Sequence, residues 1–269
     1  MIAYFSFSSV GRLAGALLLA AALPARADSF TATYNVSLIG LPIGTAHIAA
    51  DLSPTRYKIE ASARLSGFAT LVSNSRGAAN GSGAIVAGKV APAGYATTAS
   101  NAAMTRTVRM SLAGNAVTGI DISPPFEDKP DRVPVTEKDK RGILDPVGAF
   151  VFPAVGDAPL VGPAACNRTI PIFDGYTRFD IALTYVGQRS VAAKGYSGPV
   201  AVCAARYQPI AGHRPNRPAT RFMMENKDLE VWLAPVESAR VLVPYRLSVR
   251  TMIGTTVVEA SEFRVAAAR

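Results

Sequence analysis

Few residues in this sequence have the chemistry and spacing that catalysis needs. Histidine transfers protons readily at neutral pH, and the chain has two, His47 and His213. His47 lies in an alternating run of small and apolar residues typical of a strand, whereas His213 lies in a loop rich in proline and arginine. A serine nucleophile also needs a positioned histidine. The G-x-S-x-G motif is absent, because the partial match that begins at Gly195 has Pro199 at its fifth position.

Paired carboxylates are another source of acid–base chemistry. Asp174 and Asp180 flank a predicted hairpin, but Asp174 precedes Gly175, and tight-turn chemistry alone explains an Asp-Gly pair. The sequence also lacks a P-loop, a dinucleotide fingerprint, an H-E-x-x-H motif and a calcium-binding loop. We therefore expect no catalytic residue, no cofactor and no metal site, and we expect that the protein is not an enzyme. A hydrolase or isomerase is the alternative.

The two cysteines, Cys166 and Cys203, predict one disulfide bond. Neither belongs to the C-x-x-C motif that redox enzymes normally carry. A pair of cysteines in an oxidising compartment usually forms a structural disulfide. A bond across this span contributes roughly 4 kcal/mol on a chain-entropy estimate. The alternative is a reactive pair of thiols.

Residues 1–27 have the organisation of a secretory signal peptide. Arg12 supplies the positive charge, Leu13–Leu23 is an uncharged apolar run, and Ala25–Ala27 is an A-x-A cleavage site. The apolar run is shorter than the roughly 20 residues that span a bilayer. We expect export to the periplasm, cleavage of this segment and no transmembrane segment in the mature chain, 28–269. The alternative is an uncleaved anchor.

The composition excludes several classes of protein. Apolar residues make up 49% of the chain and charged residues 17%, which excludes an intrinsically disordered protein. The content of 22 Gly and 19 Pro is close to average usage and excludes a collagen-like repeat. The formal net charge is +9, but the basic clusters are not interleaved with aromatic residues, so we expect no nucleic-acid partner.

Hydrophobic residues recur at every second position over most of the chain, as in half-buried strands. Phe30–Leu38 has this pattern, Gly40–Gly44 follows as a turn, and Ala46–Leu52 runs back as the second strand of a hairpin. The alternation is cleanest over Val241–Val249. Further strands are predicted over residues 57–63, 105–112, 117–122, 168–173, 176–185, 200–207, 228–234 and 255–265.

Three segments depart from this alternation. Residues 65–73 place their large apolar side chains at helical spacing, which predicts a short helix. Residues 124–142 are rich in proline and charge, which predicts a surface loop. A second helix is predicted over Leu144–Phe152, because Asp145 is a suitable N-cap and Pro146 suits the first helical position.

About a dozen short strands with one or two short helices predict an all-β fold, since an α/β fold would place helices between the strands. Turns are expected at Asp174-Gly175 and at Gly187-Gln188. We expect an antiparallel open or spiral β-barrel with one or two short plug helices. Residues 28–269 then form a single domain, with a possible subdivision near 124–142.

One loop carries a cluster of basic side chains that suits contact with anions. His213, Arg214, Arg217 and Arg221 lie close together in the sequence, and a guanidinium binds phosphate through two hydrogen bonds. An exported basic protein meets anionic envelope surfaces, such as the phosphates of phospholipids. The alternative is a solvated face that is charged for solubility.

One predicted strand, Leu229–Ala234, is apolar on both faces. In a barrel that holds a ligand, the inner face of a strand is apolar because it contacts the ligand. The outer face is apolar as well where other elements cover it. Trp232 in this strand is therefore a candidate for contact with a lipophilic ligand. Packing beneath a helix or loop is the alternative. Three aromatic or aliphatic residues of the predicted helices are further candidates for the cavity lining: Phe68, Leu71 and Phe150.

Several motifs together resemble a known family. The segment Cys166–Asp180 contains a Cys, a strand, Phe-Asp-Gly, Arg, an aromatic residue and Asp. This hairpin resembles one found in exported proteobacterial proteins of unknown function. The hairpin Tyr34–Ala46 and the Leu144–Pro146 helix start are similar too. The resemblance implies the architecture of the periplasmic lipoprotein carriers LolA and LolB and of the envelope-integrity protein EipB, antiparallel sheets curled around helical plugs, and it implies no catalytic residues.

These observations predict a periplasmic protein that binds a lipophilic or acylated envelope component. It would act as a lipid or lipoprotein carrier, or as a chaperone-like protein in envelope integrity, with a lipoprotein acyl chain as a possible ligand. The alternative is a non-enzymatic envelope scaffold without a ligand cavity. Such a scaffold would bind a protein or peptidoglycan through the basic loops 124–142 and 208–221.

Overall fold

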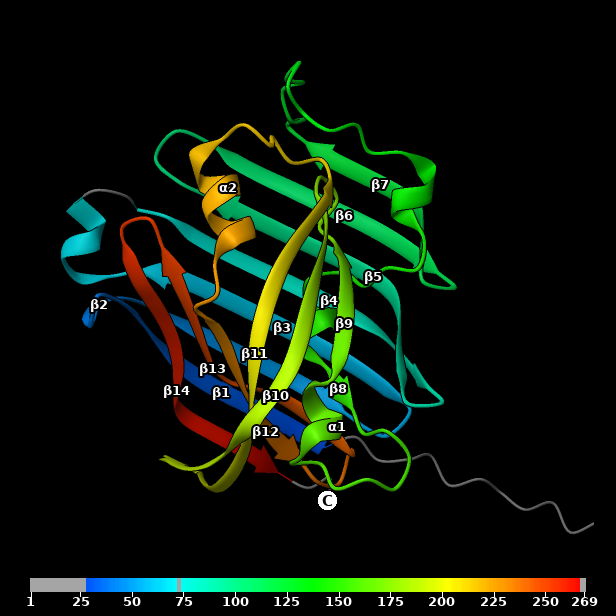
Figure 1. The fold of residues 1–269 in the computed structure, drawn as a ribbon, viewed down its shortest axis with the longest axis vertical. Coiled ribbons are helices and arrows are strands. Elements are labelled where there is room, and N and C mark those ends of the chain that lie inside the picture. The colour runs from blue at the N-terminus through cyan, green and yellow to red at the C-terminus, as the bar shows by residue number, and fades with distance from the viewer. Residues whose placement is uncertain (1–27, 72–73, 267–269) are drawn as a thin grey trace, which may run out of the picture.

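One antiparallel sheet of fourteen strands makes up most of the part of the chain that the computed structural model describes, residues 28–71 and 74–266 (Figure 1). The signal peptide predicted over 1–27 lies outside the described residues. The strand order is β7-β6-β5-β4-β3-β2-β1-β14-β13-β12-β11-β10-β9, and β8 pairs with β13. Along this order, neighbouring strands are also consecutive in the sequence except where β14 meets β1.

The first seven strands form a meander, and in the first of them buried and exposed side chains alternate. In β1, Phe30, Ala32 and Tyr34 are buried, while Thr31 and Asn35, which alternate with them, are exposed. The alternation predicted at the start of the chain is therefore confirmed. The seven strands are β1 (Asp28–Leu38), β2 (Leu41–Leu52), β3 (Arg56–Leu65), β4 (Arg76–Val86), β5 (Lys89–Ser100), β6 (Thr105–Ala113) and β7 (Ala116–Ser123).

The C-terminal strands continue the sheet and bring the last strand beside the first, where Ala260 pairs with Tyr34. The turn predicted at Gly187-Gln188 is wrong, because one long strand runs through this site with a change of register between Tyr185 and Gly187. The strands are β9 (Arg168–Phe173), β10 (Arg178–Ala193), β11 (Tyr196–Ala211), β12 (Leu229–Val236), β13 (Val241–Thr251) and β14 (Gly254–Ala266).

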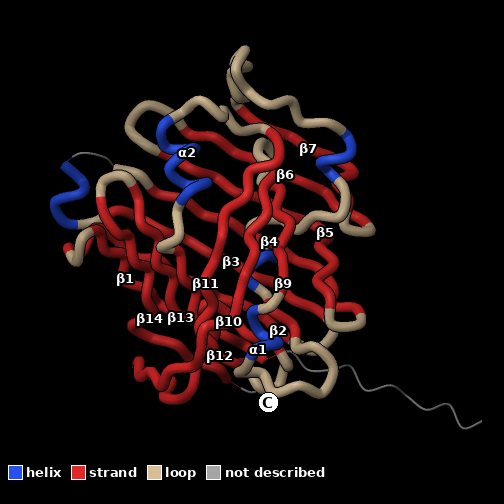
Figure 2. The backbone as a smooth tube through the Cα atoms, in the orientation of Figure 1, coloured by secondary structure: helices blue, strands red, loops and turns tan. Residues whose placement is uncertain are grey.

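The sheet curls but does not close, so β7 and β9 remain its edges. Residues 141–144 connect the two edges through isolated bridges to Ala116 of β7 and Ile172 of β9. The β9–β10 turn lies inside the curl, since a Cβ on Gly175 would lie 2.5 Å from Cγ1 of Val108 in β6. Figure 2 shows β9–β11 crossing in front of β3–β6. The prediction of an open, antiparallel all-β barrel is confirmed.

The helices in the described residues are few and short. The helix predicted over Leu144–Phe152 is a single 3-10 turn, because Phe152 already pairs with Leu242 of β13. The loop predicted over 208–221 contains the start of a helix that begins at Pro218 and was not foreseen. The helical elements and the shortest strand are η1 (Gly67–Leu71), η2 (Glu137–Lys140), η3 (Gly148–Phe150), β8 (Phe152–Pro153), α1 (Pro163–Cys166) and α2 (Pro218–Glu225).

Residues 143–153, which we call the plug, lie between the two walls of the curled sheet. Val147 and Val151 are buried with the inward side chains of β1–β6, whereas Phe152 belongs to the buried cluster of β9–β13. The plug lies close against β4, since a Cβ on Gly81 would lie 2.9 Å from Cβ of Val147. Glycine in β4 therefore makes room for the plug, which covers part of the inner face of the sheet.

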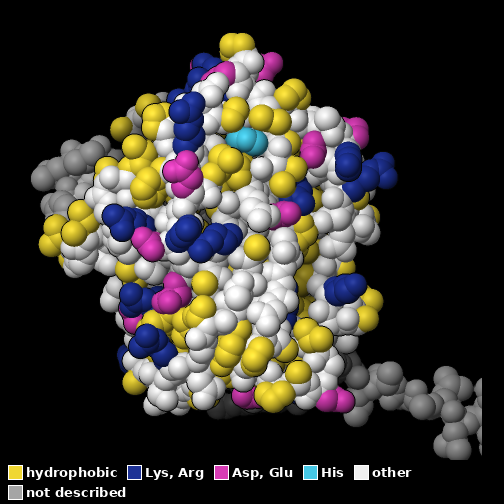
Figure 3. Space-filling view, in the orientation of Figure 1, with side chains coloured by type: hydrophobic (Ala, Val, Ile, Leu, Met, Phe, Trp, Pro, Cys, Tyr) yellow, Lys and Arg dark blue, Asp and Glu magenta, His cyan; other side chains and the backbone are white. Residues whose placement is uncertain are grey.

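Charged side chains are dispersed over the face of the molecule that β9–β11 cover (Figure 3). Lys and Arg side chains are interspersed there with Asp and Glu rather than forming one continuous basic field. Two of the ion pairs join Arg250 of β13 to Asp228, which precedes β12, and Arg246 of β13 to Glu259 of β14. The net positive charge of the chain is thus not gathered into a single patch on this face.

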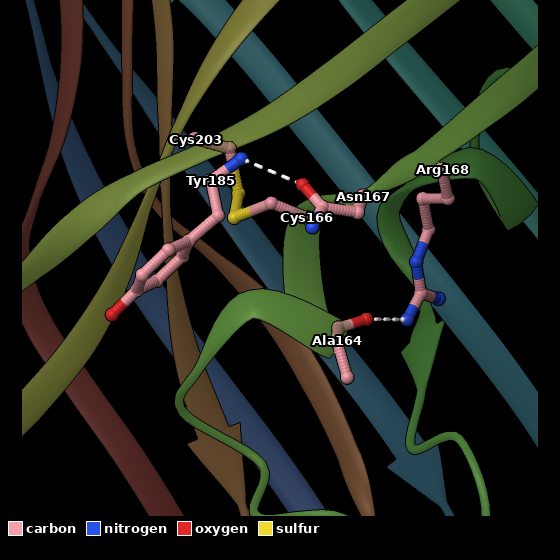
Figure 4. The surroundings of a disulfide bond; sticks show 6 residues. All are labelled: Ala164, Cys166, Asn167, Arg168, Tyr185 and Cys203. Carbon is pink, nitrogen blue, oxygen red and sulfur yellow. Dashed lines mark hydrogen bonds between the residues drawn. A yellow bond between two sulfur atoms is a disulfide. The ribbon is translucent and has the colours of Figure 1, made fainter.

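The predicted disulfide is present and joins Cys166 at the end of α1 to Cys203 in β11 (Figure 4). The two Cα atoms are 5.4 Å apart, and both residues are fully buried. Neighbouring polar contacts hold the same region, because Asn167 accepts a hydrogen bond from the Tyr185 N–H at 3.0 Å and Arg168 donates to the Ala164 carbonyl at 2.7 Å. The disulfide therefore fastens the segment that follows the plug to the long hairpin outside it.

Candidate ligand-binding hollow

The inner face of the sheet is only partly filled by the plug. A cavity of about 690 Å³ opens at the end of the sheet where β3 and β5 finish and β4 and β6 begin. A second cavity of about 310 Å³ lies against the plug. The two share Ala63, Gly77 and Thr97 as lining residues, so they adjoin one another. We call the pair the hollow, and the open end of the larger cavity its mouth.

Small inward side chains create this hollow. In β3, the inward residue next to the plug is Tyr57, which is buried, but farther along the same face the strand carries Ala61 and Ala63. Across the strand pair, Ala61 lies opposite Ala79 and Ala63 lies opposite Gly77. Four such residues together are too small to reach the opposite wall, and the space between the walls stays open.

The cavity against the plug has an almost entirely apolar wall. Phe150 of η3, which the sequence suggested as a cavity residue, lines it together with Tyr34, Leu247 and Val258. The Tyr34 hydroxyl donates a hydrogen bond to the Pro244 carbonyl at 2.7 Å, and burial raises the pKa of this phenol. Its polar atom is therefore satisfied, and its ring contributes an apolar surface of the kind that lines small-molecule pockets.

A stack of four side chains forms one side of the mouth. The Phe126 ring stacks on the Tyr176 ring with centroids 3.8 Å apart. The guanidinium of Arg106 lies 3.9 Å from the Phe126 centroid, and that of Arg132 lies 3.5 Å from the Tyr176 centroid. Such cation–π contacts add to the packing. The stack ties the loop 124–142 to the β9–β10 turn and so holds this side of the mouth in place.

Asp174 is the acidic residue in the lining of the larger cavity, and it holds the β9–β10 turn. Its Oδ1 accepts hydrogen bonds from the N–H groups of Tyr176 at 2.8 Å and Thr177 at 2.6 Å. Burial raises the pKa of this carboxyl, and the two hydrogen bonds oppose the rise. Asp180, the other carboxylate of the possible acid–base pair, forms an ion pair with Arg178 at 2.5 Å. The two carboxylates thus make different contacts.

Trp232 lies away from the lining of both cavities. Its ring is 5.0 Å from the guanidinium of Arg246 and 5.5 Å from that of Arg189, and its Nε1–H donates to Glu230 at 2.5 Å. The strand is apolar on both faces, as the sequence indicated, but Trp232 contacts charged neighbours. The two remaining candidates, Phe68 and Leu71, belong to η1, and their side chains lie outside the described part of the chain.

The basic loop that contains His213, Arg214, Arg217 and Arg221 makes some of its contacts within the protein. Arg214 forms an ion pair with Asp131 at 2.7 Å, which joins this loop to the polar loop 124–142. Arg217 and Arg221 are exposed, and Arg221 donates to the Asn216 side chain. His213 is half-buried, and burial lowers the pKa of its imidazole. The four residues are close in space, but they do not line the hollow.

The small residues that create the hollow were missed from the sequence. The signal was present in the Gly- and Ala-rich stretch before Tyr95, where inward positions such as Gly77 and Ala79 carry almost no side chain. Within the described residues, no group of three or more His, Cys, Asp or Glu is placed to hold a metal ion. No helix in this part of the chain is long and apolar enough to cross a membrane.

Comparison with solved structures finds the same architecture in another protein of unknown function. A crystal structure of a beta-barrel-like protein of the DUF1849 domain of unknown function from Brucella abortus aligns with a TM-score of 0.54. The alignment covers 90% of this chain and 100% of that chain at 10% sequence identity, so the likeness concerns the fold alone. No curated protein matches the chain in sequence.

The sequence itself matches one family model over nearly all of the described residues. The model is described as "Protein of unknown function (DUF3108)", and it covers residues 29–261. This span includes the curled sheet, the plug and both cysteines. The expected membership in a β-barrel family of unknown function is confirmed, and the chain belongs to the DUF3108 family.

Proposed function

We propose that the protein is a non-enzymatic carrier that holds a lipophilic or acylated component of the cell envelope in the hollow. The observation that carries this proposal is the pair of adjoining cavities, whose deeper wall is formed by apolar side chains and backbone. An acyl chain gains ~0.8 kcal/mol for each methylene that it buries. A hollow of this size and lining therefore suits one acyl chain.

The signal peptide predicted in the sequence supports a role outside the cytoplasm. An exported protein meets lipids and acylated proteins in the periplasm, and its disulfide is compatible with that oxidising compartment. Cell fractionation and intact-mass measurement test this part of the proposal. We expect a periplasmic protein whose mature chain begins at Asp28. A cytoplasmic protein that retains residues 1–27 would contradict it.

Binding of a neutral lipid tests the hollow itself. We expect monopalmitoylglycerol to bind the purified protein, and we expect the variant A63F/A99F to weaken that binding by at least about tenfold. Ala63 and Ala99 both line the larger cavity and are exposed, so phenylalanine would fill space there without displacing buried neighbours.

The matched control is A49F. Ala49 is exposed on the outer face of β2, outside the hollow. We expect A49F to bind monopalmitoylglycerol like the unmodified protein. If A63F/A99F folds normally and binds the lipid with unchanged affinity, the hollow is not the binding site and the proposal fails.

A further inference from the structure

Two neighbouring turns at the mouth end of the sheet expose large aliphatic side chains. These are Ile39 (67% exposed) and Leu41 (55%) at the β1–β2 turn, and Met252 (59%) and Ile253 (71%) at the β13–β14 turn. Figure 3 shows hydrophobic side chains along this left-hand edge, where Figure 1 places the β13–β14 turn and the start of β2. We call these four side chains the apolar tip. Turns usually carry Gly, Asn, Asp or Ser, so this composition is unusual.

The two turns contact each other and present the apolar tip as one surface. The Ile39 N–H donates to the Thr255 carbonyl at 2.9 Å. A Cβ on Gly254 would lie 2.3 Å from Cγ1 of Ile39, so the Ile39 side chain lies against the second turn. The Thr251 hydroxyl closes that turn by donating to the Gly254 carbonyl at 2.7 Å. A contiguous exposed apolar surface is typical of a site that binds a protein or a membrane.

The backbone at Ile39 favours a residue of a different type. Its φ is +53°, in the left-handed region, and the φ of Gly40 is +78°. Two-residue turns of this kind usually have the sequence Asn-Gly or Asp-Gly, because a β-branched side chain is strained at positive φ. Ile39 is also largely exposed, so burial does little to offset the strain. A strained residue of this kind is typical of a functional site, which supports a role for Ile39 outside the fold itself.

The turns of the meander at the mouth end are basic. Each charged residue in these turns and in the strand ends that flank them is an arginine: residues 36–45, 63–77 and 98–107 contain Arg64, Arg76 and Arg106 and neither Asp nor Glu. At the opposite end of β2 and β3, residues 49–60 contain acidic and basic side chains together. At the β13–β14 turn, Arg250 contacts Asp228 at 3.2 Å. The mouth end of the meander therefore suits an anionic partner.

We propose that the apolar tip inserts into an anionic lipid bilayer, with Arg64 and Arg76 facing the head groups of that surface. Both arginines are exposed. Arg64 pairs with Thr45, four residues along β2 from Leu41, so it is set back from the tip by roughly 13 Å at ~3.3 Å per residue. Inserted aliphatic side chains reach about 5–10 Å into the boundary between head groups and acyl chains. The arginines then lie close to the lipid phosphates.

A bilayer suits the apolar tip better than a protein partner does. A stable protein interface uses roughly 20–30 residues on each side and is enriched in aromatic residues and arginine at its centre. The apolar tip offers four aliphatic side chains on two narrow turns, which is enough for insertion into a lipid surface but small for a protein interface. The basic residues behind it match the negative charge of a bilayer that contains anionic lipids.

The apolar tip adjoins the mouth of the hollow. Val36, three residues before Ile39 in β1, lines the larger cavity, and so does Met104, which is exposed in the β5–β6 turn. A bilayer on the tip would therefore lie beside the mouth, and an acyl chain would enter the hollow with little exposure to water. This inference goes beyond the proposed function, because docking needs the apolar tip and carrying a lipid needs the hollow.

Flotation with lipid vesicles tests this inference. The vesicles are either phosphatidylcholine alone or an equimolar mixture of phosphatidylcholine and phosphatidylglycerol. We expect the purified protein to float with the anionic vesicles, and we expect the bound fraction to fall with the neutral vesicles and with added salt. We expect the variant I39N/I253S to bind the anionic vesicles at least about tenfold more weakly, because it removes two of the inserted aliphatic side chains.

The variant I39N/I253S should retain the fold, since asparagine suits the left-handed backbone at position 39 and Ile253 is exposed. Circular dichroism and thermal unfolding check this. The matched control is V86S, because Val86 is 60% exposed at the opposite end of the sheet, beside the β4–β5 turn. We expect V86S to bind the anionic vesicles within about twofold of the unmodified protein.

A second pair of variants tests the charge. We expect R64Q/R76Q to weaken binding to the anionic vesicles by about tenfold. The control R56Q/K89Q removes the same net charge from the opposite ends of β3 and β5, where both side chains are exposed. We expect this control to bind the anionic vesicles within about twofold of the unmodified protein.

Several results would overturn the inference. The unmodified protein would stay behind when the anionic vesicles float, or I39N/I253S would float as the unmodified protein does. An equal loss in V86S would show that the position of the aliphatic side chains is irrelevant, and an equal loss in R56Q/K89Q would reduce the charge effect to net charge. A dimer in solution that I39N/I253S converts to a monomer would identify the apolar tip as an interface between two copies of the chain.

The same variants separate docking from the proposed function. We expect I39N/I253S to bind monopalmitoylglycerol like the unmodified protein, and we expect A63F/A99F, which fills the hollow, to float with the anionic vesicles. Failure of flotation with intact monopalmitoylglycerol binding would overturn the docking site and leave the carrier standing. Normal flotation without monopalmitoylglycerol binding would do the reverse.

Discussion

The hydroxyl of Tyr57 and the carboxyl of Asp145 meet against Gly148 in the interior of the barrel. A Cβ on Gly148 would lie 2.7 Å from the Tyr57 hydroxyl and 2.8 Å from Oδ2 of Asp145. Both of these polar atoms are buried, and neither has a hydrogen-bond partner within the described residues. The other oxygen, Oδ1, accepts the N–H groups of Val147 and Gly148 at 2.9 Å each. The contacts of Asp145 with Tyr57, Val147 and Gly148 position the plug, and they place the Asp145 carboxyl in an apolar environment.

The substitution D145N tests the protonation state of this carboxyl. Burial raises the pKa of Asp145 above its ordinary value of 3.8, against the hydrogen bonds that lower it. Relative to the unfolded chain, the folded state therefore holds the proton of this carboxyl more tightly. The stability that this proton contributes is fully present below the pKa of the unfolded chain and is lost as pH rises through the folded pKa.

An asparagine at position 145 keeps the acceptor for the two N–H groups and does not ionise. We expect the free energy of unfolding of D145N, relative to the unmodified protein, to increase as pH rises from acid to neutral. Urea unfolding at a series of pH values measures this difference. A difference that stays constant over the whole range would show that Asp145 has the same pKa in the folded and unfolded states.

The substitution G148A tests the close packing of the plug. Gly148 is not in the left-handed region, so the effect of a methyl group is steric. Its contact with the Tyr57 hydroxyl and the Asp145 carboxyl would force one of them to move, and we expect a loss of about 1–3 kcal/mol in the free energy of unfolding. Gly94 has no heavy atom within 4 Å of its Cβ position, and G94A should be nearly neutral. Equal losses in the two variants would contradict the packing argument.

The disulfide should stabilise the fold without controlling ligand binding. We expect C166A/C203A to unfold with a free energy lower by about 2–4 kcal/mol, since the bond restrains the unfolded chain. Thermal unfolding with and without reductant measures the effect. Reductant should lower the melting temperature of the unmodified protein and leave that of the double variant unchanged. If reductant has no effect on the unmodified protein, the bond does not restrain the unfolded chain in solution.

The ion pair between Arg214 and Asp131 should hold two loops together. The hydrogen bond from Arg214 lowers the pKa of the Asp131 carboxyl. Two backbone hydrogen bonds lie beside the pair, from Val133 to His213 at 2.9 Å and from Gly212 to Val133 at 2.8 Å. We expect R214A to increase amide hydrogen exchange at Val133 and Gly212. The exposed Arg217 provides the control, because R217A should leave these rates unchanged.

The same substitutions separate loop structure from partner binding. A scaffold that uses the basic loop would lose a captured partner when Arg217 and Arg221 are reversed in charge, although both side chains are exposed and contribute little to the fold. If only R214A loses the captured partner, the partner instead requires the ordered loop and not the charges of Arg217 and Arg221. An unchanged set of partners in all variants would remove this loop from consideration as a contact surface.

The strands were predictable from the sequence wherever one face packs on large side chains. Phe30, Ala32 and Tyr34 in β1 are buried in alternation with polar residues, so period two is visible. In β4 the inward residues include Gly77 and Ala79, and the difference between the two faces disappears from the sequence. The same small residues create the hollow, so the region of the proposed lipid-binding site has the weakest pattern in the sequence.

Other features depend on contacts between distant segments and could not be derived locally. The plug is held as a single 3-10 turn because Phe152 pairs with β13, far along the chain. The apolar neighbours of Trp232 in the sequence made it a reasonable candidate for the cavity lining. The register of β12 against β13 places it opposite Arg246, whose guanidinium lies over its ring. Arg64 and Arg76 are separated by η1 in the sequence, and only the pairing of β3 with β4 brings them face to face.

Native mass spectrometry of the protein isolated from the envelope of the cells that make it tests the lipid-binding hollow most directly. The account predicts a population heavier than the mature chain, whose added mass is released as an acylated molecule on activation and is absent from A63F/A99F isolated in the same way. A single mass equal to the bare chain in both proteins, under conditions that preserve other lipid complexes, would contradict it.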